Sequence, residues 1–349
     1  MMFIERRGSQ NSHVTFHHIS HSRKEEVKMK KSVVVRGFGL WVGITLMASM
    51  LVLSPAWAKD LHFAVCMPTL DQPHFVAMKY GFEDEAKKLG IKVTVYDAGG
   101  YANVARQIQQ IEDARAVKVD ALVVVACSAD GIVPAVEEVI KDGIPVINVN
   151  QMVNTEKVLA RVRSDDVEIG RMAGRHLAEK LNGEGGVVML PGRAGTSVII
   201  MRAQGVKEVL GKYPKIKILA EQYTEMTRAI GMNLMEDFLQ AHGNAIQGAY
   251  CVGEHLGMGA AQALAATKRK DVIVVAVDFS KDLEAALRDG RIAATVVQQP
   301  INMGRFGIRL GKDAVEGKSL PKMTYVPISL ITGKEVDTVD RSGFEIPSK

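Results

Sequence analysis

The stretch LHFAVCM at residues 61–67 is apolar at almost every position, and this composition decides the fold class. Three later segments share it, at residues 92–96, 121–126 and 145–149. Near-continuous apolar runs are typical of parallel strands that are covered on both faces. Segments with apolar residues at three- and four-residue spacing, which predicts helices, alternate with them at residues 75–89, 103–117 and 132–141. This alternation predicts an α/β fold with a doubly wound parallel sheet.

The same alternation starts again in the second half of the chain. Further strands are expected at residues 186–190, 216–222, 248–252 and 272–277, with helices at 197–210, 227–240, 256–267 and 281–287. Two such series predict two Rossmann-like lobes. A helix at 301–315 and a strand at 326–330 follow the second series, and no Gly/Ser-rich or Pro-rich linker separates the halves. We therefore expect a chain that crosses between the lobes several times.

Residues 1–58 have the pattern of a leader rather than of a folded domain. A basic segment opens with Met29, residues 37–52 form an apolar run, and Ala56-Trp57-Ala58 ends it with the small residues that a signal peptidase recognises. The apolar run is shorter than the roughly 20 residues of a membrane-spanning helix. We expect translation to start at Met29 and a signal peptide at 29–58 to be cleaved after Ala58, which places the mature protein in the periplasm. A retained N-terminal anchor is the alternative.

Charge and motifs disfavour several classes of function. The chain carries 44 basic and 39 acidic residues, but the two numbers become equal once residues 1–58 are set aside. Without a basic face or a basic helix-turn-helix, binding to nucleic acid is disfavoured. The motifs of α/β-hydrolases, P-loop NTPases and zinc proteases are missing, and the mature histidines are too dispersed to predict a metal site. We predict that the protein is not an enzyme and that it uses no cofactor and no metal.

The three cysteines, Cys66, Cys127 and Cys251, are too few for a disulfide framework. Cys66 and Cys127 lie near the ends of strands that we expect to be neighbours, which would allow them to pair in an oxidising compartment. Three free thiols are the alternative that we favour, because unpaired cysteine is commonly buried as a small apolar residue.

Polar side chains follow nearly every expected strand, at the edge of an open parallel sheet where ligands bind. Amides and carboxylates there exchange hydrogen bonds with hydroxyl groups, and an aromatic ring supplies an apolar wall. The residues that we expect to bind a ligand are Gln72, His74, Phe75, Asn150, Gln151, Asp278 and Gln298. Helix capping is the alternative role for Asp278, and Thr196 or Ser197 is also expected to cap a helix.

The strand-end segments, in this order, resemble those of the ribose-type periplasmic binding proteins, the sugar receptors of ABC importers. The segments that carry the resemblance are PTLDQPHFV (68–76), GIPVI (143–147), SDD (164–166), AGTS (194–197) and AATVVQQP (293–300). The resemblance covers the mature chain and implies two lobes joined by three crossings, near Ser164, Gln298 and Pro327. It implies an N-terminal lobe of residues 59–163 plus 299–326 and a C-terminal lobe of residues 164–298 plus 327–349.

The resemblance carries the ligand site over only in part. It implies that Phe75 is the ring that stacks on the sugar, that Gln72 is a polar contact, that Asp278 accepts from hydroxyl groups, and that Gln298 is an amide beside a hinge. Several family positions hold other residue types here: His74 and Met226 at aromatic positions, Gly253 at an asparagine, and Asn150-Gln151 at an Asp-Arg pair.

The largest departure from the family concerns its arginines. The arginine expected in the helix after Ser197 falls on Ile200, and Arg202 is expected on a different face of that helix. We therefore expect a cleft in which amides replace two guanidinium groups and one carboxylate. Because Ile cannot supply the two-pronged donor of Arg, ribose is disfavoured. A polyol, a deoxy-sugar or another small neutral polar compound is the expected ligand.

These features predict a monomeric receptor that captures a small sugar-like ligand by hinge closure and delivers it to the membrane permease of an ABC importer. The alternative is a periplasmic sensor subunit that presents its ligand-bound form to a histidine kinase or chemoreceptor. Both roles use the same closure of two lobes around a ligand.

Overall fold

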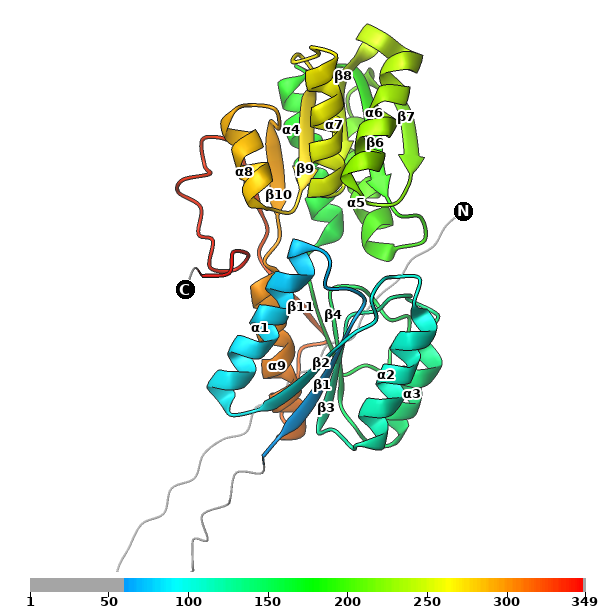
Figure 1. The fold of residues 1–349 in the computed structure, drawn as a ribbon, viewed down its shortest axis with the longest axis vertical. Coiled ribbons are helices and arrows are strands. Elements are labelled where there is room, and N and C mark those ends of the chain that lie inside the picture. Colours follow the sequence, from blue (N-terminus) through cyan, green and yellow to red (C-terminus); the bar gives the residue numbers. More distant parts are fainter. Residues whose placement is uncertain (1–59, 348–349) are drawn as a thin grey trace, which may run out of the picture. The chain divides into compact units, whose positions relative to one another are not determined.

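The computed structural model of the protein describes residues 60–347, which form two six-stranded sheets covered by helices (Figure 1). This arrangement confirms the predicted fold class. The expected start at Met29 and the expected signal peptide at 29–58 lie outside the described residues.

The first sheet has the strand order β11-β5-β4-β3-β1-β2, and its strand pairs are parallel. Its strands are β1 (His62–Met67), β2 (Lys92–Asp97), β3 (Ala121–Val124), β4 (Val146–Val149), β5 (Ala160–Arg163) and β11 (Met323–Tyr325). Its helices are α1 (Pro73–Leu89), α2 (Val104–Ala116), α3 (Val133–Lys141) and α9 (Pro300–Val315).

Helices cover both faces of this sheet, which explains its continuous apolar strands. Helices α1 and α9 pack on each other, and so do α2 and α3 (Figure 1). Along β1, Phe63 and Val65 pack in one core with α1 and α9, whereas Ala64 and Cys66 pack in the other core with α2 and α3. Successive side chains of a strand point to opposite faces, so each face needs its own apolar residues.

The second sheet has the strand order β12-β10-β9-β8-β6-β7, and only its edge strand β12 is antiparallel in the described chain. Its strands are β6 (Glu184–Gly192), β7 (Lys215–Tyr223), β8 (Ile246–Cys251), β9 (Ile273–Val277), β10 (Ala294–Val297) and β12 (Ser329–Ile331). Its helices are α4 (Asp166–Lys180), α5 (Ser197–Leu210), α6 (Arg228–His242), α7 (Glu254–Ala266) and α8 (Lys281–Arg288), with a 3₁₀ turn at Gly243–Ala245. Helix α4 packs on α5, and α6 packs on α7.

The chain passes between the two sheets at three places within residues 60–347: between β5 and α4, between β10 and α9, and between β11 and β12. The single strand predicted at 326–330 is wrong, because the chain leaves the first sheet after Tyr325 and joins the second at Ser329. Pro327 lies between the two strands and has no N–H group for a sheet hydrogen bond. The lobe boundaries predicted from the resemblance remain a proposal.

Glycines allow close contact in two helix pairs, α1 with α9 and α4 with α5. A Cβ atom at Gly81 in α1 would clash with the backbone of Ile301 in α9. A Cβ atom at Gly170 in α4 would clash with the carbonyl group of Arg202 in α5. The first contact joins the middle of α1 to the start of α9, and the second joins α4 to α5 at Arg202.

Candidate functional site

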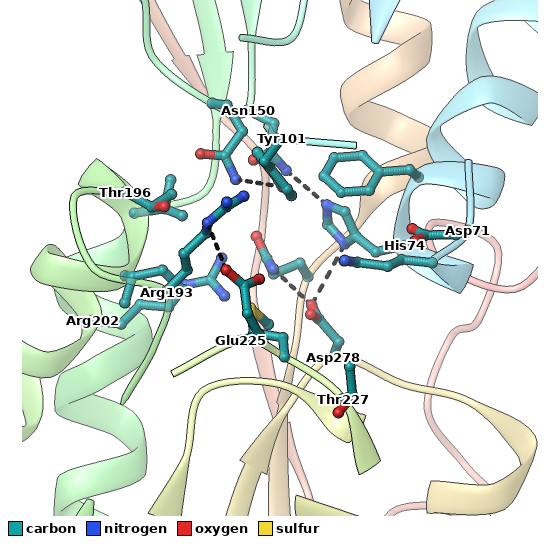
Figure 2. A pocket seen from close by; sticks show the side chains of 17 residues that line it. Asp71, His74, Tyr101, Asn150, Arg193, Thr196, Arg202, Glu225, Thr227 and Asp278 are labelled. Carbon is teal, nitrogen blue, oxygen red and sulfur yellow. Dashed lines mark hydrogen bonds and ion pairs between the residues drawn. The ribbon is translucent and has the colours of Figure 1, made fainter. Parts of the chain in front are cut away.

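A cavity of about 160 Å³ lies at the carboxyl ends of strands from both sheets. The structure brings all seven residues of the predicted ligand site to it; their role in ligand binding stays a prediction. The lining residues are Asp71, Gln72, His74, Phe75, Tyr101, Asn150 and Gln151 from segments around the first sheet, and Arg193, Thr196, Val198, Ile199, Arg202, Glu225, Met226, Thr227, Asp278 and Gln298 from segments around the second (Figure 2).

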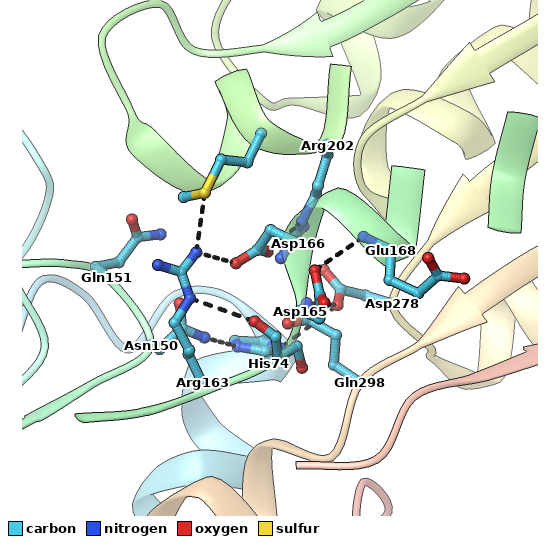
Figure 3. A network of polar contacts seen from close by, with 12 residues as sticks. His74, Asn150, Gln151, Arg163, Asp165, Asp166, Glu168, Arg202, Asp278 and Gln298 are labelled. Atoms are coloured by element: carbon cyan, nitrogen blue, oxygen red, sulfur yellow. Dashed lines mark hydrogen bonds and ion pairs between the residues drawn. The ribbon is translucent and has the colours of Figure 1, made fainter. Parts of the chain in front are cut away.

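His74 connects the two halves of this cavity. Its Nδ1 atom lies 3.5 Å from Oδ1 of Asp278, and its Nε2 atom lies 2.7 Å from the side-chain nitrogen of Asn150. The side-chain amide of Gln298 donates to the same Asp278 oxygen over 2.7 Å. A continuous polar chain therefore runs from Asn150 through His74 and Asp278 to Gln298 (Figure 3).

Asn150 and Asp278 occupy matching places in the two sheets. Each follows the fourth strand of its series, β4 or β9, and each has a positive φ angle, 59° and 74° respectively. Left-handed backbone is uncommon outside glycine, and Asn and Asp adopt it most readily among the other residues. Backbone bonds hold both turns: Asn150 N–H donates to Val162, and Asp278 N–H donates to Val296. Both side chains are thus directed by a fixed backbone.

The Asp278 side chain is partly buried, with 19% of its surface exposed. Burial alone would raise its pKa, but its neighbours His74 and Arg202 and the hydrogen bond from Gln298 outweigh burial and lower that pKa below its ordinary value. Asp278 is therefore an ionised acceptor at neutral pH. Helix capping is not its role, because Ser280 accepts from the Leu283 N–H group at the start of α8.

Two aromatic rings form the apolar wall. Phe75, in the first turn of α1, lies edge-on to Tyr101, with ring centroids 6.2 Å apart. The Gln151 side-chain amide donates to the Tyr101 hydroxyl over 3.2 Å. Tyr101 was not predicted from the sequence, because it lies beyond the end of the strand expected at residues 92–96, after the turn at Gly99 and Gly100.

Three comparisons with known proteins agree on the family. Residues 63–319 match the periplasmic binding protein domain family. The chain is 31% identical over 314 residues to the ribose import binding protein of Bacillus subtilis, covering 88% of this chain and 100% of that one. It is 31% identical over 281 residues to the D-allose-binding periplasmic protein of Escherichia coli, covering 78% and 90%.

The chain belongs to the ribose-type periplasmic binding proteins. Its fold agrees: the substrate-binding protein of a sugar ABC transport system from Bordetella parapertussis superposes with a TM-score of 0.78 at 27% identity, covering 83% of this chain and 95% of that one. The resemblance inferred from the strand-end segments is confirmed at the level of the family.

Compared with the family pattern, the expected loss of guanidinium groups from the cleft is wrong. Ile200 is 49% exposed and does not line the cavity, but Arg193 and Arg202 do. Arg202 is 4% exposed, and its Nε atom donates to Asp166 over 2.8 Å. The expectation that Arg202 lies on another face of its helix is wrong, because α5 packs on α4 and this packing buries Arg202 beside Asp166 at the cavity.

Asp166 holds two buried arginines in place. It accepts from Arg202 and from Arg163, at the crossing between β5 and α4 (Figure 3). Its neighbour Asp165 caps α4 by accepting from the Glu168 N–H group over 3.0 Å. The segment SDD, quoted for its resemblance to the family, therefore links a lobe crossing to the cavity wall.

Several other residues of this binding protein were predicted for other roles or not at all. Met226 lines the cavity, whereas Gly253 lines a smaller adjoining space with Glu254 and His255. Thr196 is the residue before α5, but its side chain makes no capping hydrogen bond. Asp71 was missed, and its carboxylate accepts from the Thr69 hydroxyl over 2.6 Å.

The three cysteines are free thiols, as favoured from the sequence. Cys66 and Cys251 are buried, and burial raises the pKa of Cys127 to about 12, so it is protonated at neutral pH.

In residues 60–347, no three His, Cys, Asp or Glu side chains come together as a metal site. Among the same residues, no helix has the length and apolar character needed to cross a membrane.

Proposed function

We propose that this protein captures one small, hydroxyl-rich ligand in the cavity between its lobes and delivers it to an ABC importer. The observation that carries the proposal is the polar chain from Asn150 to Gln298, because it draws on both lobes and would be shared with a bridging ligand. A ligand that contacts both lobes stabilises the closed arrangement by its differential affinity for it. Hinge closure is therefore the proposed mechanism.

The chemistry of the lining suits hydroxyl groups. The amides of Gln72, Asn150 and Gln151 both donate and accept, while ionised Asp278 only accepts. The ring of Phe75 offers an apolar face for the C–H groups of a sugar or polyol. The guanidinium group of Arg202 adds further N–H donors, although its Nε atom already donates to Asp166.

The volume of the cavity favours a ligand that is smaller than a typical drug molecule. Its volume of about 160 Å³ lies below the range of about 300–1,000 Å³ found for drug-sized ligands. A single pentose, a deoxy-sugar or a polyol is the proposed class. Amides at Asn150 and Gln151 differ from the family's charged pair, which argues for a ligand other than ribose.

We further propose that the protein works in the periplasm as a monomer, binds its ligand without converting it, and is cleaved after Ala58 from a precursor that starts at Met29. The name of its relative from Escherichia coli states a periplasmic location. N-terminal sequencing of the precursor and of the exported protein tests this point, and a precursor peptide that begins at Met1 would contradict the proposed start.

A thermal-shift screen of residues 59–349 against pentoses, hexoses and polyols tests the proposed function. A ligand that binds only the folded protein increases the free energy of unfolding, by about 2.7 kcal/mol at a ligand concentration of one hundred times the Kd. The melting temperature therefore rises. We expect Asp278→Ala to abolish this shift while the protein still folds. Asp237→Ala, at an exposed position on α6, is the matched control and should keep it. An equal shift in Asp278→Ala would show that the site is misplaced.

A further inference from the structure

The described chain ends in a segment that lies beside the crossing between β10 and α9 (Figure 1). Residues 341–345, which we call the terminal segment, lie beyond β12 and form turns. The terminal segment contacts the turn after β9, helix α8 and the start of α9. Asp278 lies in that turn, and Gln298 lies between β10 and α9. The terminal segment therefore contacts the backbone regions that carry two residues of the ligand cavity.

Phe344 packs its ring on Phe279, the residue that directly follows Asp278. The ring centroids are 5.0 Å apart and the ring planes are inclined by 61°, an edge-to-face geometry that aromatic pairs prefer. Phe344 is partly buried and also packs against the core of the second sheet. Asp278 has left-handed backbone, which persists in a residue other than glycine only where its surroundings hold it. The ring pair thus restrains the turn that directs the Asp278 side chain.

Arg341 anchors the terminal segment to helix α8. Its guanidinium group donates to both carboxylate oxygens of Glu284 in α8, over 2.9 and 3.1 Å, and to the carbonyl of Val336 over 2.6 Å. Two parallel bonds of this kind fix the direction of an arginine as well as its position. The same guanidinium group lies 5.3 Å from the centre of the Phe279 ring. Phe279 is therefore held by two residues of the terminal segment.

Gly343 joins the terminal segment to helix α9. Its carbonyl group accepts from the Ile301 N–H group over 2.9 Å. The first N–H groups of a helix lack partners within the helix, and Gln299, directly before α9, makes no capping bond with its side chain. The Gly343 carbonyl supplies an acceptor there. Because α9 packs in a core of the first sheet and α8 belongs to the second, the terminal segment links the two lobes at this crossing.

We propose that the terminal segment positions Asp278 and Gln298 for ligand binding, by holding the turn after β9 and the start of α9 in place. Phe344 and Arg341 act through Phe279. The terminal segment contributes no residue to the lining of the ligand cavity, so its residues are positioning residues. This inference rests on the proposed function, because it concerns the affinity of the same site.

Amide hydrogen exchange, followed by NMR on ligand-free residues 59–349, tests the positioning. Phe344→Ala removes one aromatic pair, so we expect the Asp278 and Ile301 amides to exchange about tenfold faster. The amides of β6 and β8 should keep their rates. Phe344→Tyr retains the ring and should restore both rates. Phe238→Ala is the matched control: it removes a ring from the same core, on α6, and should leave the Asp278 and Ile301 rates unchanged.

Calorimetric titration with D-xylose, D-allose, xylitol and myo-inositol measures the consequence for binding. For each compound that the parent protein binds, we expect Phe344→Ala to weaken the affinity by about tenfold, well below the melting temperature of the variant. Phe344→Tyr and Phe238→Ala should bind like the parent. Arg341→Met, which removes the pair with Glu284, is the second variant and should weaken binding even if Phe344→Ala does not fold.

Three results would overturn the positioning role. One is unchanged exchange at Asp278 and Ile301 in the folded variants, and another is unchanged affinity in them. The third is an equal acceleration of exchange at β6 and β8, which would show that the terminal segment only stabilises the fold. Absence of binding by all four compounds to the parent protein would instead overturn the proposed ligand class, and the exchange rates would still decide whether the terminal segment holds the turn and the helix start.

Discussion

His74 is a single ring that contacts residues of both lobes, and it stands at a position where the family resemblance implies an aromatic residue. Its two nitrogen atoms face Asn150 and Asp278, so the ring fills the hydrogen-bonding positions between them. The role of His74 depends on its contacts with Asn150 and Asp278. These contacts form because the turns after β4 and β9 lie close together in the fold, although they are far apart in the sequence. The identity of residue 74 alone does not predict them.

The lowered pKa of Asp278 makes a prediction for stability against pH. A carboxyl group with a lowered pKa stabilises the folded protein above its unfolded pKa of about 3.9, and this contribution is lost as pH falls through the folded value. We expect ligand-free Asp278→Asn to melt at a lower temperature than the parent protein at pH 7, and the difference to shrink below about pH 4. Melting temperatures across pH 2.5–7 measure it. A difference that stays constant over that range would contradict the assignment.

Asp166 is the residue whose loss should cost the most stability in this region. Its side chain is 2% exposed and holds the buried arginines Arg163 and Arg202. Removing one partner of a buried pair leaves uncompensated charge, which costs about 3–5 kcal/mol. We expect Asp166→Ala to lower the free energy of unfolding in urea by that amount. Asp282→Ala, which removes an exposed pair with Arg228, should change it little.

At the scale of elements, the sequence predicted most of the fold and less of the site. Apolar runs and helical spacing located the strands and helices, because both patterns are set by which face each element buries. The split of the last predicted strand into β11 and β12 was missed, since an apolar segment does not show where the chain changes sheets. Arg202 was misplaced because its direction depends on the packing of α5 against α4.

Helix α4 and helix α5 approach closely at Gly170, and this contact makes a further prediction. Gly170→Ala places a methyl group against the carbonyl of Arg202, so the two helices must separate. Overpacking of this kind typically costs about 1–3 kcal/mol. We expect that loss in the free energy of unfolding, measured in urea, together with weaker ligand binding because Arg202 lines the cavity. Gln204→Ala on the exposed side of α5 is the control, and an unchanged stability in Gly170→Ala would contradict the close contact.

At the scale of the whole molecule, the first lobe depends on residues from the end of the chain. Helix α9 supplies Met303, Ile308 and Leu310 to the core that α1 shares, and β11 forms an edge of the first sheet. We expect a fragment of residues 59–298 to leave the first lobe unfolded, with fast hydrogen exchange at the β1 and β3 amides. Residues 59–349 should protect them. Slow exchange in the fragment would show that α9 and β11 are dispensable.

The same dependence sets the order of events during synthesis. A chain that emerges from the ribosome N-terminus first cannot complete its first lobe until residues 300–325 have been made, after the whole second series of strands and helices. The long-range pairing of β11 with β5 also makes folding slow. The late return of the chain to its first sheet would therefore leave the first lobe unable to fold while the second lobe is being made.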